Sequence, residues 1–158
     1  MILLIMKVQE LCTFLVRAKT STYASGREGA VMEDRSKELV FEEKNFRYRD
    51  RYLGFNPFIG EEIVFRKGRL LWGMNYYGFV SSRIVSPKEV YGFLREALRR
   101  VDEERPFRGP ENYVHGHFSY VNWVEGTISK FRGTEKILYE GREIYKLFYH
   151  GGVIKGEL

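Results

Sequence analysis

The sequence predicts an α+β fold, in which residues 1–158 form a single domain with a curved antiparallel sheet of hairpins packed against two helices. Two stretches repeat apolar residues at the three- and four-residue spacing of an amphipathic helix. Several strand-like runs are joined by tight turns such as Lys67-Gly68 and Glu140-Gly141. The order of a helix, hairpins, a second helix and further strands is typical of an antiparallel sheet with its helices on one face.

The composition is that of a folded, water-soluble chain. Its 158 residues are enough for one domain with a proper core. A hydrophobic fraction of 44% and an aromatic fraction of 16% exclude disorder, and many of the rings are available for a pocket or an interface. The apolar run over residues 1–5 is too short to span a bilayer. A single cysteine, Cys12, excludes an internal disulfide, so we expect a cytoplasmic protein.

The charge pattern permits several partners and requires none of them. The formal net charge is +5 without a basic tail, which is compatible with an anionic ligand or nucleic acid. A charged fraction of 30%, with one glutamine in the chain, is typical of a thermophile. Translation that begins at Met6 rather than Met1 is an open alternative, which the intact mass of the native protein would test.

Residues 7 to about 20 form the first predicted helix, and the second begins near Ser86. In the second helix Ser86 caps, Pro87 takes the first helical position and Glu89 completes a capping box. Gly92 lies inside this helix at a cost of about 1 kcal/mol relative to alanine, which we expect close packing to explain. The apolar stripe of the first helix consists of Val8, Leu11, Cys12, Leu15 and Ala18.

A small polar stretch after the first helix predicts a loop to about Ser36, and a hairpin pairs residues 39–43 with residues 46–52. Its register places Glu42 opposite Arg47 and Glu38 opposite Arg51. These acidic partners argue against reading the arginine row of this strand as a nucleic-acid surface. The other face of the hairpin is aromatic and includes Asp50. A carboxyl among rings is either structural, accepting hydrogen bonds, or the raised-pKa group of a functional site.

The central hairpin turns at Lys67-Gly68 and contains the motif Trp72–Gly78. Regular two-residue pairing places Phe65 opposite Leu70, and Glu61 opposite Met74. Glu61 then lies on the apolar side or, alternatively, in water at the open end of the hairpin. A slip of one residue in the register would exchange every assignment to a face.

These registers predict a ligand pocket between the sheet and the helices. Aromatic and apolar walls with a few convergent polar groups are typical of small-molecule sites. The predicted lining comprises Tyr48, Asp50, Tyr52, Glu61, Trp72, Met74, Asn75 and Tyr76.

A small enzyme is the alternative function. His115 and His117 project to the same side if their segment is a strand, and His150 is available as a third metal ligand. Ordinary loop histidines are the alternative to such a metal centre. Asp50 with Glu61 or Glu62 is a candidate acid–base pair. No nucleophile elbow and no phosphate-binding glycine loop occurs in the sequence, and no cofactor or catalytic residue is assigned.

Short motifs along nearly the whole chain resemble an uncharacterised prokaryotic domain family, whose members occur alone or behind a helix-turn-helix of the phage-repressor type. The most specific motif is Trp72–Gly78. The resemblance implies no established activity, and the fusion partners imply a sensing or effector-binding role. A small-molecule ligand is therefore the leading expectation, and homo-oligomerisation through the excess aromatic residues is a further one. The other motifs are Tyr23–Gly26, Asp50–Gly54, Phe58–Glu62, Phe107–Pro110 and Tyr149–Gly152.

Overall fold

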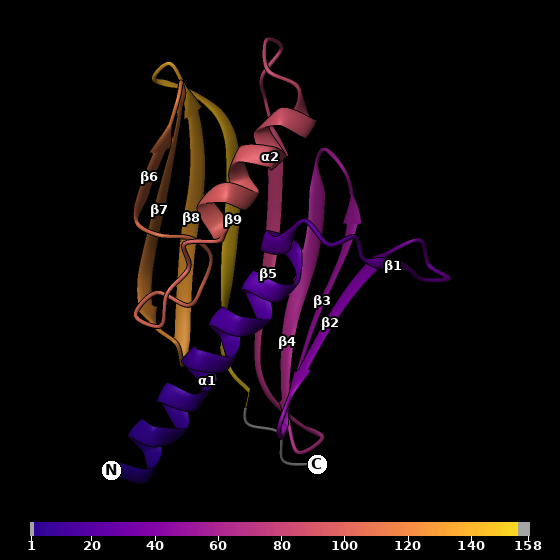
Figure 1. Ribbon diagram of the computed structural model, residues 1–158, viewed down its shortest axis with the longest axis vertical. Coiled ribbons are helices and arrows are strands. Elements are labelled where there is room, and N and C mark those ends of the chain that lie inside the picture. The colour runs from indigo at the N-terminus through magenta and orange to yellow at the C-terminus, as the bar shows by residue number, and fades with distance from the viewer. Residues whose placement is uncertain (1, 155–158) are drawn as a thin grey trace.

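The computed structural model describes residues 2–154, which form two α-helices on one face of a nine-stranded antiparallel sheet (Figure 1). The strand order across the sheet is β1-β2-β3-β4-β5-β9-β8-β7-β6. The predicted α+β class, with a curved sheet of hairpins packed against two helices, is confirmed. The elements in chain order are α1 (Ile2–Ser21), the 3-10 turn η1 (Tyr23–Ser25), β1 (Ala30–Val31), β2 (Lys37–Glu43), β3 (Phe46–Gly54), β4 (Phe58–Arg66), β5 (Arg69–Val80), α2 (Pro87–Leu98), β6 (Asn112–His115), β7 (Phe118–Thr127), β8 (Lys130–Tyr139) and β9 (Arg142–Val153).

Helix α1 begins at Ile2, five residues before the predicted start. Met1 lies outside the described residues, so the choice between Met1 and Met6 as the first residue stays a prediction. The apolar stripe faces the sheet as predicted, and Leu15 is fully buried. Cys12 is buried in the same stripe, and burial raises the pKa of its thiol. Within residues 2–154 no helix has both the length and the apolar character needed to cross a membrane.

Helix α2 begins as its sequence predicts. The side chain of Ser86 accepts a hydrogen bond from the backbone N–H of Glu89 at 3.3 Å, and Pro87 is the first helical residue. The expectation that Gly92 permits close packing is wrong, because a Cβ built at this position would meet no atom within 4 Å. The predicted loop before β2 also contains the short edge strand β1.

The β2–β3 hairpin has the predicted register. Glu42 pairs with Arg47 and Glu38 pairs with Arg51, and each pair forms a salt bridge of 3.1 Å. The third arginine of this row is also paired, since Arg49 contacts a carboxylate of β4 at 2.9 Å.

The β4–β5 hairpin follows the predicted register only next to its turn. Phe65 lies opposite Leu70, but a β-bulge between Val64 and Phe65 shifts all pairs beyond it by one residue. Glu62, rather than the predicted Glu61, therefore lies opposite Met74 on the buried face. The inward assignment of Glu61 is wrong because a bulge cannot be read from the alternation of apolar residues.

The two halves of the molecule repeat one another. Helix α1 precedes the two-residue edge strand β1 and four longer strands that end with β5, helix α2 precedes four strands that end with β9, and β5 and β9 pair at the centre of the sheet. The β8–β9 hairpin carries a bulge between Ile137 and Leu138, at the same distance from its turn as the bulge of β4. Counted back from the two turns, Glu62 of one half corresponds to Glu135 of the other.

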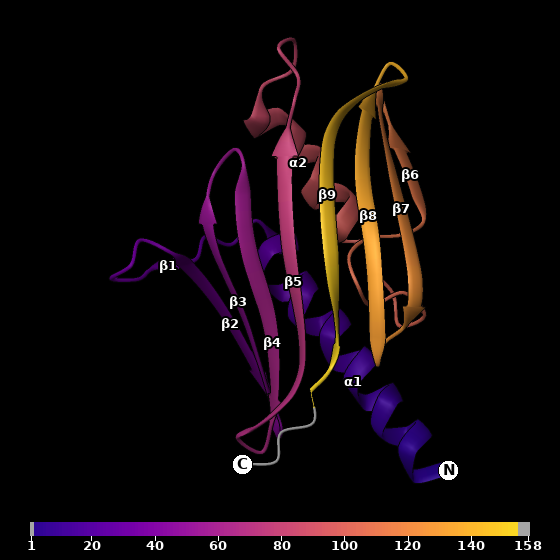
Figure 2. The same ribbon diagram turned by 180° about the vertical axis from the view of Figure 1, so that it is seen from behind.

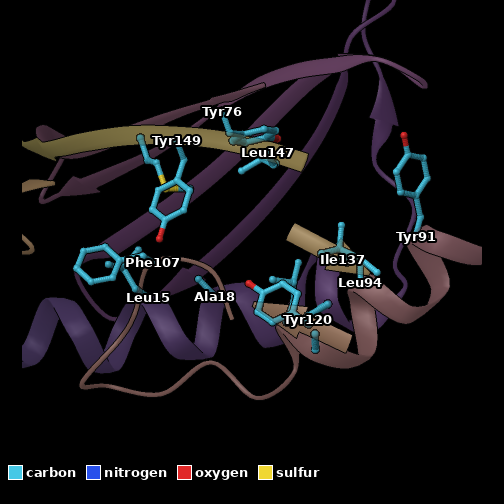
Figure 3. Close-up of a cluster of buried hydrophobic side chains, with 14 of the residues drawn as sticks. Leu15, Ala18, Tyr76, Tyr91, Leu94, Phe107, Tyr120, Ile137, Leu147 and Tyr149 are labelled. Atoms are coloured by element: carbon cyan, nitrogen blue, oxygen red, sulfur yellow. The ribbon is translucent and has the colours of Figure 1, made fainter. Parts of the chain in front are cut away.

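The core lies between this sheet and the two helices, as the cluster of buried side chains in Figure 3 shows. Tyr76 and Tyr149 lie opposite each other on the central strand pair. Their rings lie across Gly60 and Gly133, where an added Cβ would come within 2.5 and 2.1 Å of the respective ring. Among the described elements, no helix covers the other face of the sheet (Figure 2).

Candidate functional site

A cleft of about 510 Å³ lies on the helix-covered side of the sheet, in the first half of the molecule. Strands β3 to β5 contribute one wall, α2 another, and the segment that follows η1 forms part of the rim. Six of the lining side chains are aromatic, five are cationic and two are acidic. The complete lining is Tyr23, Gly26, Arg27, Glu28, Lys37, Asp50, Tyr52, Gly54, Phe55, Phe58, Tyr76, Lys88, Tyr91, Arg95 and Arg108.

Asp50 is the acidic group at the floor of the cleft. The alternation of β3 turns it inward with Tyr48 and Tyr52, and its exposed fraction is 4%. The hydroxyl of Tyr76 donates a hydrogen bond of 2.6 Å to Oδ1 of Asp50. Within residues 2–154 the carboxyl of Asp50 makes no other hydrogen bond, so Oδ2 is available to a molecule bound in the cleft.

A network of buried charges continues behind Asp50. A second cavity of about 20 Å³, enough for about one water molecule, touches both Asp50 and Arg108. Lys19 of α1 forms an ion pair with Glu62 and donates to the carbonyl of Phe107 at 2.8 Å. Arg108 forms a bidentate pair with Glu135, through Nε at 3.1 Å and Nη2 at 2.9 Å. Nη1 of Arg108 has no partner among the described residues.

Three buried carboxyls therefore share the interior with two buried cations. Burial disfavours a charge on Asp50, and the carboxylate of Glu62 directly across the strands disfavours it further. Together these effects raise the pKa of Asp50 to about 7, against the opposing hydrogen bond from Tyr76 and the charges of Lys19 and Arg108. Asp50 therefore changes its protonation state near neutral pH, which is a property of many functional carboxyls.

One face of helix α2 supplies cations and a ring to the cleft. Lys88, Tyr91 and Arg95 follow one another at helical spacing, so all three face the same side. Tyr91 is buried, and its hydroxyl donates to the carbonyl of Phe55 at 2.6 Å. Arg95 is half-buried, and its guanidinium has no hydrogen-bond or ion-pair partner within the described part of the chain. A cation in this state is available to an anionic ligand.

The second half of the molecule has no carboxyl at the position that corresponds to Asp50. There the hydroxyl of Tyr149 donates to the side-chain amide of Asn122 at 2.7 Å. Asn122 lies opposite Glu135, as Asp50 lies opposite Glu62. A neutral amide thus accepts the tyrosine hydrogen bond that Asp50 accepts in the first half, so the fold itself does not require an acid at position 50.

The structure brings half of the predicted pocket residues together. Asp50, Tyr52 and Tyr76 line the cleft, and Tyr48 lines the small cavity behind it. Trp72 and Met74 are fully buried core residues that line neither space, and the indole of Trp72 donates to the carbonyl of Ile128. Because of the β4 bulge, Glu61 faces the other side of the sheet, where the alternation of β5 places Asn75 as predicted.

Glu61 and Asn75 line a separate hollow of about 570 Å³ on the uncovered face of the sheet. It is larger and more open than the cleft, and its walls include the exposed side chains of Ile59, Tyr77 and Phe148. The charged groups at this hollow have ion-pair partners beside it, since Glu61 pairs with Arg49 and Arg51 pairs with Glu38. We regard the cleft, which contains the buried carboxyl of Asp50 and the guanidinium of Arg95 that has no partner within residues 2–154, as the better candidate site. Asp50 and Glu61 lie on opposite faces and form no acid–base pair.

His115 and His117 lie at one turn, and His150 lies on a different strand. His115 contacts Glu96 at 2.8 Å and His117 contacts Glu140 at 3.3 Å, near the turn between β6 and β7. His150 lies in the middle of β9, beside Asn75 and on the uncovered face. Among residues 2–154 no group of three or more histidine, cysteine, aspartate or glutamate side chains has the arrangement of a metal site.

Sequence reasoning missed Lys19, Arg108 and Glu135, and it named Glu62 only as an alternative to Glu61 in an acid–base pair. Lys19 follows Leu15 by four residues on the apolar stripe of α1, so its position was a usable signal. Arg108 lies in a loop without periodicity, and no pattern marks it. The inward positions of Glu62 and Glu135 depend on bulges that lie between them and the turns.

Residues 50–154 match a sequence family described as a domain of unknown function, DUF5680. The chain belongs to the DUF5680 family. No curated protein and no solved structure matches the chain. The DUF5680 region includes Asp50, Tyr76, Arg95 and Arg108, whereas Lys19 precedes it. The floor and the α2 wall of the cleft therefore belong to the part of the chain that defines the family.

Proposed function

We propose that this protein binds a small molecule in the cleft above Asp50. The observation that carries the proposal is a buried carboxyl, open to a cleft of about 510 Å³, at a position where the other half of the molecule uses the amide of Asn122. A buried acid costs stability that an amide would not cost. Proteins commonly accept such a cost at functional sites.

The experiment is a ligand-observed NMR screen of charged and neutral aromatic fragments, with a version of the protein whose cleft is blocked. The native Cys12 is buried, so a cysteine placed at Lys37 on the rim can be labelled selectively with a bulky maleimide. We expect fragments to bind the native protein and the unlabelled K37C variant, and labelling to abolish binding.

The matched control is K130C with the same label, because Lys130 is exposed and does not line the cleft. Labelled K130C should bind as the native protein does. Binding that persists in labelled K37C, or the absence of any hit from a broad library, would refute a ligand site in the cleft.

An enzyme that uses Asp50 alone as general acid or base is the second candidate. It is favoured by the pKa of about 7, because proton transfer is most effective when the pKa lies near the working pH. Recovery of a bound ligand unchanged after long incubation with the protein, measured by mass spectrometry, would exclude this alternative for that ligand.

A regulatory role, in which the bound ligand is an effector, belongs to the same proposal. It rests on the resemblance to prokaryotic domains that follow a helix-turn-helix, and a cytoplasmic setting agrees with the free thiol of Cys12. Homo-oligomerisation stays a prediction, and light scattering of the purified protein would test it.

A further inference from the structure

Several rings of the cleft gather around Tyr91, which lies on helix α2 between Lys88 and Arg95. Phe55, Phe58 and Tyr91 form an aromatic cluster at the β3–β4 turn, with edge-to-face ring pairs at 5.4 and 5.6 Å around Tyr91. One helical turn further along α2, Arg95 reaches the cleft, and Arg108 lies at its floor. One part of the cleft is therefore apolar and planar, and another is cationic.

Four of the five cations that line the cleft have no ion-pair partner within the described residues. Arg27, Lys37 and Lys88 are exposed at the cleft and Arg95 is half-buried, whereas Arg108 pairs with Glu135 and keeps only Nη1 unused. Against the four unpaired cations the lining holds the carboxyls of Glu28 and Asp50. A cleft with excess positive charge and partly desolvated guanidinium groups attracts an anion.

Given that the cleft is the ligand site, we propose that its ligand is an organic anion with a planar apolar body. The carboxylate or phosphate of the ligand pairs with Arg95 and Nη1 of Arg108, and its body lies against Phe58 and Tyr91. A carboxylate and a phosphate can each accept two parallel hydrogen bonds from a guanidinium, so the same arginines can recognise either group.

Asp50 makes the affinity for such a ligand depend on pH. An anion beside Arg108 lies close to Asp50, and two negative charges there repel each other. Binding of the anion therefore favours the protonated form of Asp50. Above pH 7 the carboxyl of Asp50 takes up a proton when the ligand binds, and the affinity increases as the pH falls through about 7. The charged and titratable groups that face Asp50 from the neighbouring elements are Lys19 of α1, Tyr23 of η1, Lys37 of β2, Glu62 of β4, Tyr76 of β5, Arg95 of α2 and Arg108 of the α2–β6 loop.

The test uses four probes with the same ring system and different charge: 2-naphthoate, 2-naphthyl phosphate, 2-naphthylmethanol and 2-naphthylmethylamine. Isothermal titration of the full chain should give the tightest binding for one or both anions, and the ratio of the two distinguishes a carboxylate from a phosphate ligand. Replacement of Arg95 by glutamine should weaken anion binding at least about tenfold, since a charge-assisted hydrogen bond is lost. The same replacement should leave the binding of 2-naphthylmethanol within about twofold.

Arg132→Gln is the matched control, because this arginine is exposed and its side-chain hydrogen bond is with Glu125, away from the cleft. The affinities for all four probes should be the same in this variant as in the native protein.

The affinity for 2-naphthoate, which stays ionised from pH 6 to 8, should fall several-fold over this range in the native protein and stay level in D50N. A fold check by circular dichroism shows whether each variant retains its structure, and the probe series on the native protein does not depend on any variant.

Two results would overturn the inference. One is tighter binding of the amine or the alcohol than of both anions; the other is anion binding that R95Q leaves unchanged. If no naphthyl probe binds while the labelled-cleft screen yields neutral or cationic ligands, the anion preference is refuted and the small-molecule function stands. If that screen also yields nothing, both proposals are refuted.

Discussion

At the scale of single residues, the decisive feature is a carboxyl buried where an amide suffices. Asp50 and Asn122 accept the same tyrosine hydrogen bond in the two halves of the molecule, at 2.6 and 2.7 Å. The carboxyl adds a negative charge next to Glu62, in an interior whose other buried charges are two acids, Glu62 and Glu135, and two cations. Because this arrangement destabilises the charged form of Asp50, the residue makes the stability of the fold depend on pH.

We expect Asp50→Asn to stabilise the protein above neutral pH. In the folded protein the pKa of Asp50 is raised to about 7, whereas the ordinary pKa of an aspartate side chain is 3.8. The stability contributed by this difference is complete below about pH 4 and is lost as the pH rises through 7. Asparagine does not titrate, so denaturant unfolding at pH 8 should favour the variant by roughly 2–4 kcal/mol, and the gap should close at pH 4. A variant that is less stable than the native protein at pH 8 would contradict the assignment.

A second residue-scale prediction concerns the ion pair between α1 and β4. Lys19→Met leaves the carboxylate of Glu62 buried without its cation, which should destabilise the fold by about 3–5 kcal/mol. The double variant K19M/E62Q removes the charge as well as its partner and should recover part of this loss. Denaturant unfolding of the single and double variants measures the difference, and equal losses would show that the pair is not coupled.

At the scale of elements, the helices follow their local signals and the strands depend on their neighbours. The Ser86 cap and the start of α2 were predictable because the cap uses residues that lie within one turn of each other. The register beyond the Lys67-Gly68 turn was not predictable, because the bulge at Val64 and Phe65 is set by packing of the whole sheet. One bulge was enough to exchange Glu61 for Glu62 on the buried face.

Gly92 gives an element-scale prediction. Since an added methyl group would meet no atom within 4 Å, Gly92→Ala should stabilise α2 by about 1 kcal/mol, the difference in helix propensity. Equilibrium denaturation at pH 7 measures this gain. Gly133→Ala is the contrasting variant, because the ring of Tyr149 occupies the space of the new methyl group, and we expect it to lose stability.

At the scale of the whole molecule, two similar halves share one continuous sheet. Strands β5 and β9 join them along nine residue pairs from Trp72 to Val80. The first half retains an open cleft and a titrating acid, whereas in the second half Asn122 is closed in by its hydrogen bond to the carbonyl of Gly109. This difference between the halves places the candidate site on one side of the central strand pair.

We propose that residues 1–158 unfold as one domain because the central pairing leaves neither half with an intact sheet of its own. Differential scanning calorimetry should show one transition, with the calorimetric enthalpy equal to the van't Hoff enthalpy. The ligand of the cleft should raise the transition temperature, since it binds the native state. Two separate transitions would mean that the halves are independent units. A high transition temperature would agree with the thermophile-like composition.

The class of fold, the cap of α2, the turns and the inward position of Asp50 were predictable from sequence, because the patterns that indicate them involve residues close together in the chain. The carboxyls that share the interior with Asp50, and the meeting of Arg95 and Arg108 at one cleft, follow from packing in three dimensions. Bulges, and contacts between a loop and a distant strand, arise from packing among elements far apart in sequence. No local pattern records that packing, so the cationic half of the site could be found only in three dimensions.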